Sequence, residues 1–133
     1  MPTMPVDALP PSLREHFERP RRVGEPAGAQ RRGEARNEAC GDVVVVWLRV
    51  GGSPPVVEAA GWKAQGCPAT LAMASSACEV LDGLPADGTL PARLETVHAA
   101  AFGPPRPAHR HALALMAEAV RRAAGPSSGT SPL

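Results

Sequence analysis

The sequence has few aromatic residues, little net charge and no long hydrophobic run. Aromatic side chains make up 3% of the 133 residues, tyrosine is absent, and the formal net charge is +1. Proteins that bind nucleic acids depend on basic surfaces and often on aromatic platforms for the bases, so we expect no nucleic-acid partner. No apolar run is longer than that at 43–48, which is far shorter than the roughly 20 residues of a membrane span, so we expect no membrane partner.

Cysteine is also scarce, with only Cys40, Cys67 and Cys78 in the chain. An odd number at wide spacing disfavours the disulfide framework of a small secreted domain. The first residues contain no apolar stretch of the kind found in signal peptides, so we expect a cytoplasmic protein. In that compartment the thiols are expected to be free or bound to a metal.

Proline, with 16 residues, divides the chain into segments, because it destabilises helices and central strands from within. Residues 1–11 and 125–133 are rich in Pro, Ser and Gly and are predicted to be flexible tails around one domain, 12–124. Hydrophobic periodicity predicts helices at 11–17, 69–82, 91–101 and 109–124, and strands at 42–50 and 56–64. This order predicts an α+β fold, in which helices cover one face of a small antiparallel sheet of about three strands.

Two further features surround the first predicted helix. Ser12, followed by Glu15, has the spacing of a capping box that begins a helix. The segment after the helix is rich in arginine and is interpreted as a solvated linker, with a docking surface for an acidic partner as the alternative. Its arginines are Arg19, Arg21, Arg22, Arg31, Arg32 and Arg36.

The two predicted strands bring three polar side chains toward one end of the sheet. Cys40 and Asp42 stand at the start of the first strand, and Cys67 follows the second. In a hairpin these two ends lie side by side, so we expect the three side chains to converge. Pro68 is favourable at the first helical position, which makes Cys67 the N-cap, where the helix dipole stabilises a thiolate.

Two histidines at the start of the last predicted helix add an imidazole to this set. Either His109 or His111 can take the position, and a helix N-terminus keeps the ring neutral and able to bind metal. Two thiolates, a carboxylate and an imidazole suit tetrahedral zinc, and thiolates also suit iron–sulfur chemistry. The alternative interpretation is that the cysteines are ordinary buried residues and the histidines lie on the surface.

Cys78 is predicted to belong to the core and not to the metal site. It lies 11 residues beyond Cys67, which is about 16 Å along a helix, whereas a metal–sulfur bond is about 2.3 Å long. It also shares a helical face with Leu71, Ala74 and Leu81.

Four segments at the boundaries of predicted elements form an ordered set of motifs. They are 16–24 (HFERPRRVG), 37–42 (NEACGD), 64–67 (AQGC, followed by an Ala/Ser-rich helix) and 106–112 (RPAHRHA). In order and spacing, this set resembles the motifs of NifU/IscU-type iron–sulfur cluster scaffold proteins over about residues 12–124.

The resemblance implies a scaffold, not an enzyme, on which a [2Fe–2S] cluster is assembled and then passed on. A cysteine desulfurase would supply sulfur, and apo iron–sulfur proteins would receive the cluster. Carried over residue by residue, the ligands of the cluster or of iron are Cys40, Asp42, Cys67 and His111. The resemblance also implies that zinc can occupy the same site.

One position departs from the family pattern, because the family's third cysteine falls on Ala112, which has no donor atom. The remaining four side chains can still close a four-coordinate site, although with less thiolate charge. Two alternatives to a scaffold therefore stay open. One is a zinc-binding adaptor that no longer assembles clusters, and the other is a sulfurtransferase that accepts a persulfide on Cys40 or Cys67 from a desulfurase.

Overall fold

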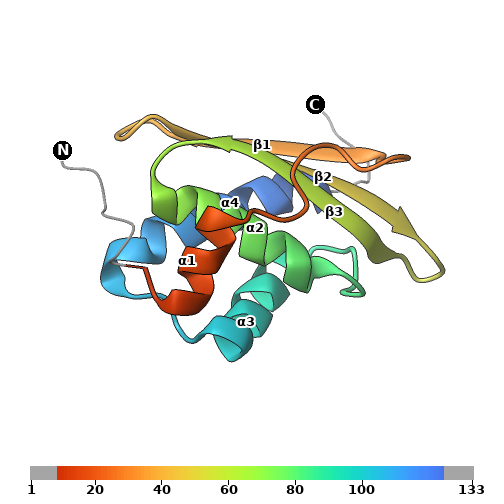
Figure 1. Ribbon diagram of the computed structural model, residues 1–133. Helices are drawn as coiled ribbons and strands as arrows, with labels where there is room; N and C mark the ends of the chain where they lie inside the picture. Colours follow the sequence, from red (N-terminus) through yellow and green to blue (C-terminus); the bar gives the residue numbers. More distant parts are fainter. Residues whose placement is uncertain (1–8, 125–133) are drawn as a thin grey trace.

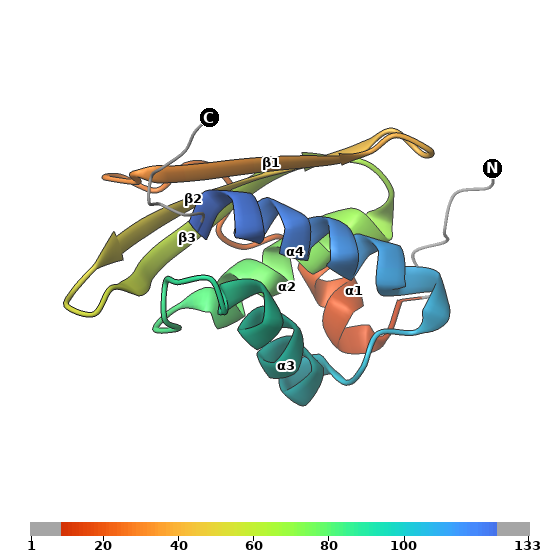
Figure 2. The same cartoon turned by 180° about the vertical axis from the view of Figure 1, so that it is seen from behind.

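A three-stranded antiparallel sheet forms one layer of the structure, and the helices form a second layer on one of its faces (Figures 1 and 2). The structure is a computed structural model that describes residues 9–124. The elements in chain order are α1 (Pro11–Glu18), β1 (Arg31–Asn37), β2 (Asp42–Gly51), β3 (Val56–Gln65), α2 (Pro68–Leu81), α3 (Leu90–Phe102), the 3₁₀ helix η2 (Pro107–His109) and α4 (Arg110–Ala124). The predicted α+β fold is confirmed.

The folded domain begins earlier than the predicted N-terminal tail allows. Residues 1–8 and 125–133 lie outside the described residues. Among the described residues of the predicted N-terminal tail, Leu9 is buried in the core and Pro11 already begins α1. None of the described helices has the length and apolar character needed to cross a membrane.

Strand β1 lies within the arginine-rich segment for which the sequence predicts a solvated linker, so that prediction is wrong for these residues. β1 pairs antiparallel with β2, with Glu34 opposite Val45. Its buried face consists of Gly33 and Ala35 only, and its other residues are polar. A strand at the edge of a sheet tolerates charged side chains, and two small residues give no visible alternation of hydrophobicity. The sequence pattern therefore does not predict this strand.

Gly33 lets α4 lie close against β1, an arrangement visible in Figure 2. A Cβ atom at this position would stand 2.1 Å from the carbonyl oxygen of Ala119 and 2.4 Å from the backbone nitrogen of Ala123. Both atoms belong to the helix backbone and cannot rotate away. The absence of a side chain at position 33 therefore sets the distance between helix and strand.

Helix α2 is the central helix, in contact with β3, α1, α3 and α4. Its sequence is rich in alanine and serine, and it is buried around almost its whole circumference instead of on one face. Small side chains allow several elements to approach the same helix. Cys78 is fully buried there, as predicted, and burial raises the pKa of its thiol.

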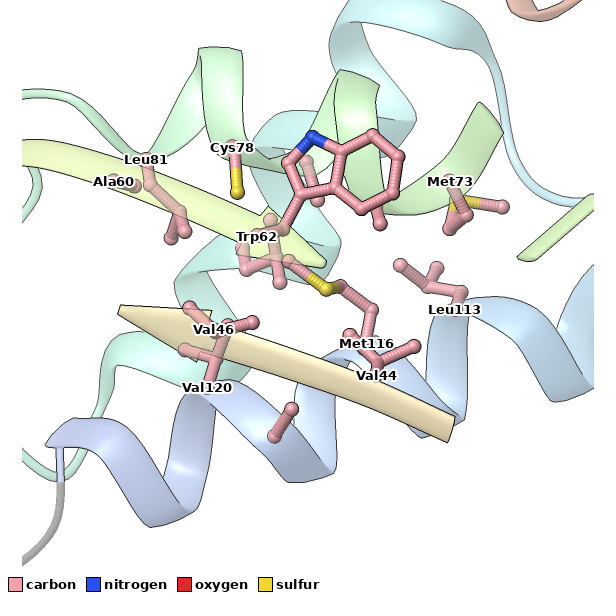
Figure 3. Close-up of a cluster of buried hydrophobic side chains, with 14 of the residues drawn as sticks. Val44, Val46, Ala60, Trp62, Met73, Cys78, Leu81, Leu113, Met116 and Val120 are labelled. Atoms are coloured by element: carbon pink, nitrogen blue, oxygen red, sulfur yellow. The ribbon is translucent and has the colours of Figure 1, made fainter. Parts of the chain in front are cut away.

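The core fills the space between the sheet and helices α2 and α4 (Figure 3). Val44 and Val46 of β2 face Met116 and Val120 of α4, and Trp62 of β3 lies over α2. Helical spacing in the sequence predicts that Leu113, Met116 and Val120 form the inner face of α4, and all three are buried. On its outer face Glu118 forms ion pairs with both arginines of the last turn.

Helix α3 is present as predicted, but its buried face is different. The spacing of Leu94, Val97 and Ala101 in the sequence predicts that they share the inner side of this helix, whereas Val97 is half-buried and Ala101 is exposed. The buried residues are Leu90, Leu94 and His98. His98 is buried because Ser76 of α2 provides a hydrogen-bond partner 2.8 Å from its Nε2 atom. A polar residue with a buried partner cannot be recognised from hydrophobicity.

The predicted capping box of α1 is also absent. The N-cap is Pro10, no side chain caps the helix, and Glu15 forms an ion pair with Arg21 instead. Helix α1 is attached to α2 through His16, whose Nδ1 lies 2.7 Å from Ser75 Oγ.

Burial of His98 predicts a pH-dependent stability. Desolvation, with a smaller contribution from His16, lowers the pKa of His98 from 6.5 to about 4. Below pH 6.5 the unfolded chain therefore binds a proton that the folded chain does not bind until about pH 4, so stability falls as the pH falls through this window. The expected contribution is roughly 3 kcal/mol, at about 1.4 kcal/mol per pKa unit.

This contribution can be isolated with His98→Gln, which keeps an amide donor for Ser76 but does not titrate. Urea unfolding at pH 7 and at pH 4.5 should show a smaller loss of stability in the variant than in the wild type. Carboxylates titrate in both proteins and cancel in the comparison. Equal losses would show that His98 is not the group responsible.

Candidate metal centre

Three potential metal ligands meet at one end of the sheet. Asp42 begins β2, Cys67 follows β3, and His111 lies in the first turn of α4. Their ligand atoms all lie within 4.8 Å of one another. Cys67 Sγ is 3.6 Å from Asp42 Oδ2 and 3.9 Å from His111 Nε2. Donors around one tetrahedral metal lie roughly 3–4 Å apart, so this thiol, carboxylate and imidazole fit zinc or iron with little rearrangement.

The fold explains the position of Asp42 and Cys67. Val43 pairs with Gln65, so the start of β2 and the end of β3 are neighbours, as predicted. Cys67 is the N-cap of α2 with Pro68 at the first helical position, also as predicted. The carbonyl oxygen of Cys67 accepts the backbone N–H groups of Thr70 and Leu71. This cap fixes the backbone that carries the thiol.

Asp42 is a buried carboxylate, with 4% of its surface exposed. Burying a carboxylate is costly unless polar groups compensate it. Thr70 compensates it by donating a hydrogen bond from Oγ1 to Asp42 Oδ2 at 2.5 Å. Thr70 is a residue of the centre that the sequence motifs do not predict. Its place three residues after Cys67, on the same side of the first helical turn, was the available signal.

The structure brings His111, and not His109, to the candidate centre. His111 is half-buried, with Nε2 toward Cys67. His109 lies in η2 and lines a separate cavity of about 210 Å³ together with His98. Burial lowers the pKa of His109, and its Nε2 is buried without a hydrogen-bond partner among the described residues.

Cys40 does not join the three ligands. It lies in the turn 38–41 between β1 and β2, where its side chain is exposed. This turn is at the same end of the sheet as Cys67, but the described group of mutually close ligand atoms contains only Asp42, Cys67 and His111. Connectivity predicted the correct end of the sheet and could not predict the direction of a side chain in a turn. Ala112, beside His111, is buried and offers no donor.

Gly66 leaves the space that the Asp42 carboxylate occupies. A Cβ atom at position 66 would lie 2.5 Å from Asp42 Cγ and 2.6 Å from Asp42 Oδ1. We therefore expect Gly66→Ala to displace the carboxylate and to weaken zinc binding by about 10–100-fold, the usual cost of disturbing the surroundings of a metal ligand. Competition with a chelating dye measures this affinity.

Gly88→Ala is the matched control for Gly66→Ala, because no atom lies within 4 Å of a Cβ at position 88. It should bind zinc like the wild type. Unchanged zinc affinity in Gly66→Ala would mean that the position of Asp42 does not matter for the metal.

Comparison with known proteins gives the family of this fold and centre. The family model of the NifU-like N-terminal domain matches residues 11–126. The bifunctional protein NifU/MnmA of Rubrobacter xylanophilus is 36% identical over 113 residues, which cover 85% of this chain and 23% of that protein. The chain thus spans less than a quarter of that relative.

Two further comparisons agree with this family assignment. The iron–sulfur cluster assembly scaffold protein IscU 1 of Archaeoglobus fulgidus is 31% identical over 109 residues, covering 82% of this chain and 69% of that protein. The crystal structure of the N-terminal part of a NifU-like protein from Brucella abortus superposes with a TM-score of 0.65 at 20% identity, covering 86% of this chain and 90% of the other. This chain therefore belongs to the NifU-like N-terminal domain family.

Proposed function

We propose that this protein is a scaffold for iron–sulfur cluster assembly, which receives iron and sulfide and passes the cluster on. The observation that carries the proposal is the preformed group of Asp42, Cys67 and His111, whose donor atoms lie within 4.8 Å of one another. The family and the name of the archaeal relative support the same role. Iron and the cluster are cargo here, and the chain acts as a carrier and not as an enzyme.

The chemistry of the three donors suits temporary binding. Cys67, the N-cap of α2, contributes a soft sulfur donor of the kind that iron and zinc bind. Asp42 contributes a hard oxygen, which is a weaker partner for a cluster than a second thiolate and favours release. Cys67 and His111 are half-buried, so a donor or recipient protein can approach the site.

Cys40 is the proposed fourth donor. Its exposed thiol lies two residues before Asp42, in the turn at the same end of the sheet. Ala112 cannot provide this donor, and Cys78 is buried in the core. We expect Cys40 to close the site when the cargo is bound, with sulfur supplied by a cysteine desulfurase and with apo iron–sulfur proteins as recipients.

Anaerobic reconstitution tests this function. The protein is incubated with ferrous iron, cysteine, a cysteine desulfurase and dithiothreitol, which reduces the transferred persulfide sulfur to sulfide, and the visible spectrum is recorded before and after addition of an apo-ferredoxin. We expect the absorption bands of a cluster to appear and then to move to the ferredoxin. Tightly held zinc that iron does not displace, or sulfur added to a thiol with no iron bound, would contradict the proposal and favour an adaptor or a sulfur relay.

A further inference from the structure

Thr70 contacts two of the three proposed ligands at once. Its Oγ1 lies 2.5 Å from Asp42 Oδ2 and 3.5 Å from Cys67 Sγ. The side chain is 1% exposed, so water does not compete for these contacts. Thr70 stands in the first turn of α2, directly after the cap formed by Cys67. No other threonine or serine hydroxyl among the described residues is placed within hydrogen-bond distance of both ligands.

The hydroxyl group of Thr70 donates its hydrogen bond to Asp42. A carboxylate oxygen can only accept, so the short contact to Asp42 uses the single proton of the hydroxyl. Toward Cys67 Sγ, Thr70 Oγ1 then offers a lone pair. The hydroxyl therefore holds Asp42 Oδ2, which is also the carboxylate oxygen 3.6 Å from Cys67 Sγ.

The other carboxylate oxygen lies close to the backbone of Gly66. Asp42 Oδ1 lies over Gly66, where even a Cβ atom would stand only 2.6 Å away. The carboxylate is thus held by a hydroxyl on α2 and packed against the backbone of Gly66, directly after β3. Fixed carboxylates bind metals more tightly, because less conformational freedom is lost on binding.

We propose that Thr70 is a positioning residue, which acts through Asp42 by holding Oδ2 beside Cys67 before the metal arrives. This inference rests on the proposed function, since it assigns a role within the same centre. The proposed role depends on the hydroxyl group of Thr70 and not on the branched shape of its side chain.

Two substitutions separate the hydroxyl from the shape of the side chain. Thr70→Val keeps the branched shape and removes the hydroxyl, while Thr70→Ser keeps the hydroxyl and removes the methyl group. Co²⁺ is the probe, because its absorption reports both binding and thiolate coordination. We expect Thr70→Val to lower Co²⁺ affinity by about tenfold or more, and Thr70→Ser to stay within about threefold of the wild type. In an Asp42→Ala background, Thr70→Val should have less than about a twofold effect, as expected for residues that act through one another.

The outcomes distinguish this inference from the function on which it rests. Loss of affinity in Thr70→Ser with a normal Thr70→Val would show a packing role and overturn the inference alone. An equal loss from Thr70→Val with and without the Asp42 carboxylate would also overturn it. Failure of the wild type to bind Co²⁺ through a thiolate would overturn the proposed centre as well. Circular dichroism of each variant checks that the fold is intact.

Discussion

Cys67→Ser is expected to lose metal binding almost completely. Cys67 Sγ lies within 4 Å of ligand atoms of both Asp42 and His111 and is the only thiol in the group of mutually close ligands among the described residues. A serine hydroxyl does not ionise at neutral pH and is a poor ligand for zinc or iron. Disturbing the surroundings of a ligand costs about 10–100-fold in affinity, so loss of this direct ligand should cost more than about 100-fold. Zinc and iron content after loading measures the effect.

The other two cysteines serve as internal controls for this prediction. Cys78→Ala removes a buried thiol far along α2 and should leave the metal content unchanged. Cys40→Ser should have an intermediate effect, because this thiol is exposed and is not part of the preformed group. Normal metal content in Cys67→Ser, with loss only in Cys40→Ser, would show that the centre is built differently.

Gly33→Ala is expected to destabilise the whole domain. The added Cβ would collide with backbone atoms of Ala119 and Ala123, so α4 must move away from β1. Overpacking in a close-packed core costs about 1–3 kcal/mol or more, and here no flexible side chain can yield. Urea unfolding followed by circular dichroism measures the loss.

Gly88→Ala again provides the comparison, because its Cβ meets no atom within 4 Å. Its stability should differ from that of the wild type by no more than about 1 kcal/mol. Equal stability of Gly33→Ala and Gly88→Ala would mean that the contact between α4 and β1 is looser than the structure indicates.

The elements with long or periodic apolar patterns could be predicted from the sequence. Strand β2 contains a run of valines, and α4 repeats its apolar residues at helical spacing. A buried face needs apolar residues at regular spacing, and this spacing is visible in the local sequence. The hairpin between β2 and β3 followed from the short turn that joins them.

The missed features depend on particular partners elsewhere in the chain. Strand β1 is buried only at Gly33 and Ala35, because α4 approaches it so closely. His98 is buried because Ser76 faces it from another helix. Neither partner is near in the sequence, so no local pattern could reveal the contact.

The candidate centre was predictable to a similar extent. Connectivity placed Asp42 and Cys67 at the same end of the sheet, and the resemblance to the family selected His111 over His109. The exposed direction of Cys40 and the hydrogen bond from Thr70 depend on side-chain geometry, which spacing does not determine.

The most direct test of the proposed centre is the iron and acid-labile sulfide that remain bound after anaerobic reconstitution and gel filtration. The wild type is compared with a folded variant that combines Asp42→Ala, Cys67→Ser and His111→Ala. We predict that the wild type retains iron and sulfide in equal amounts and that the variant retains neither. Equal retention by both proteins, or no retention by the wild type, would contradict a cluster centre at these three residues.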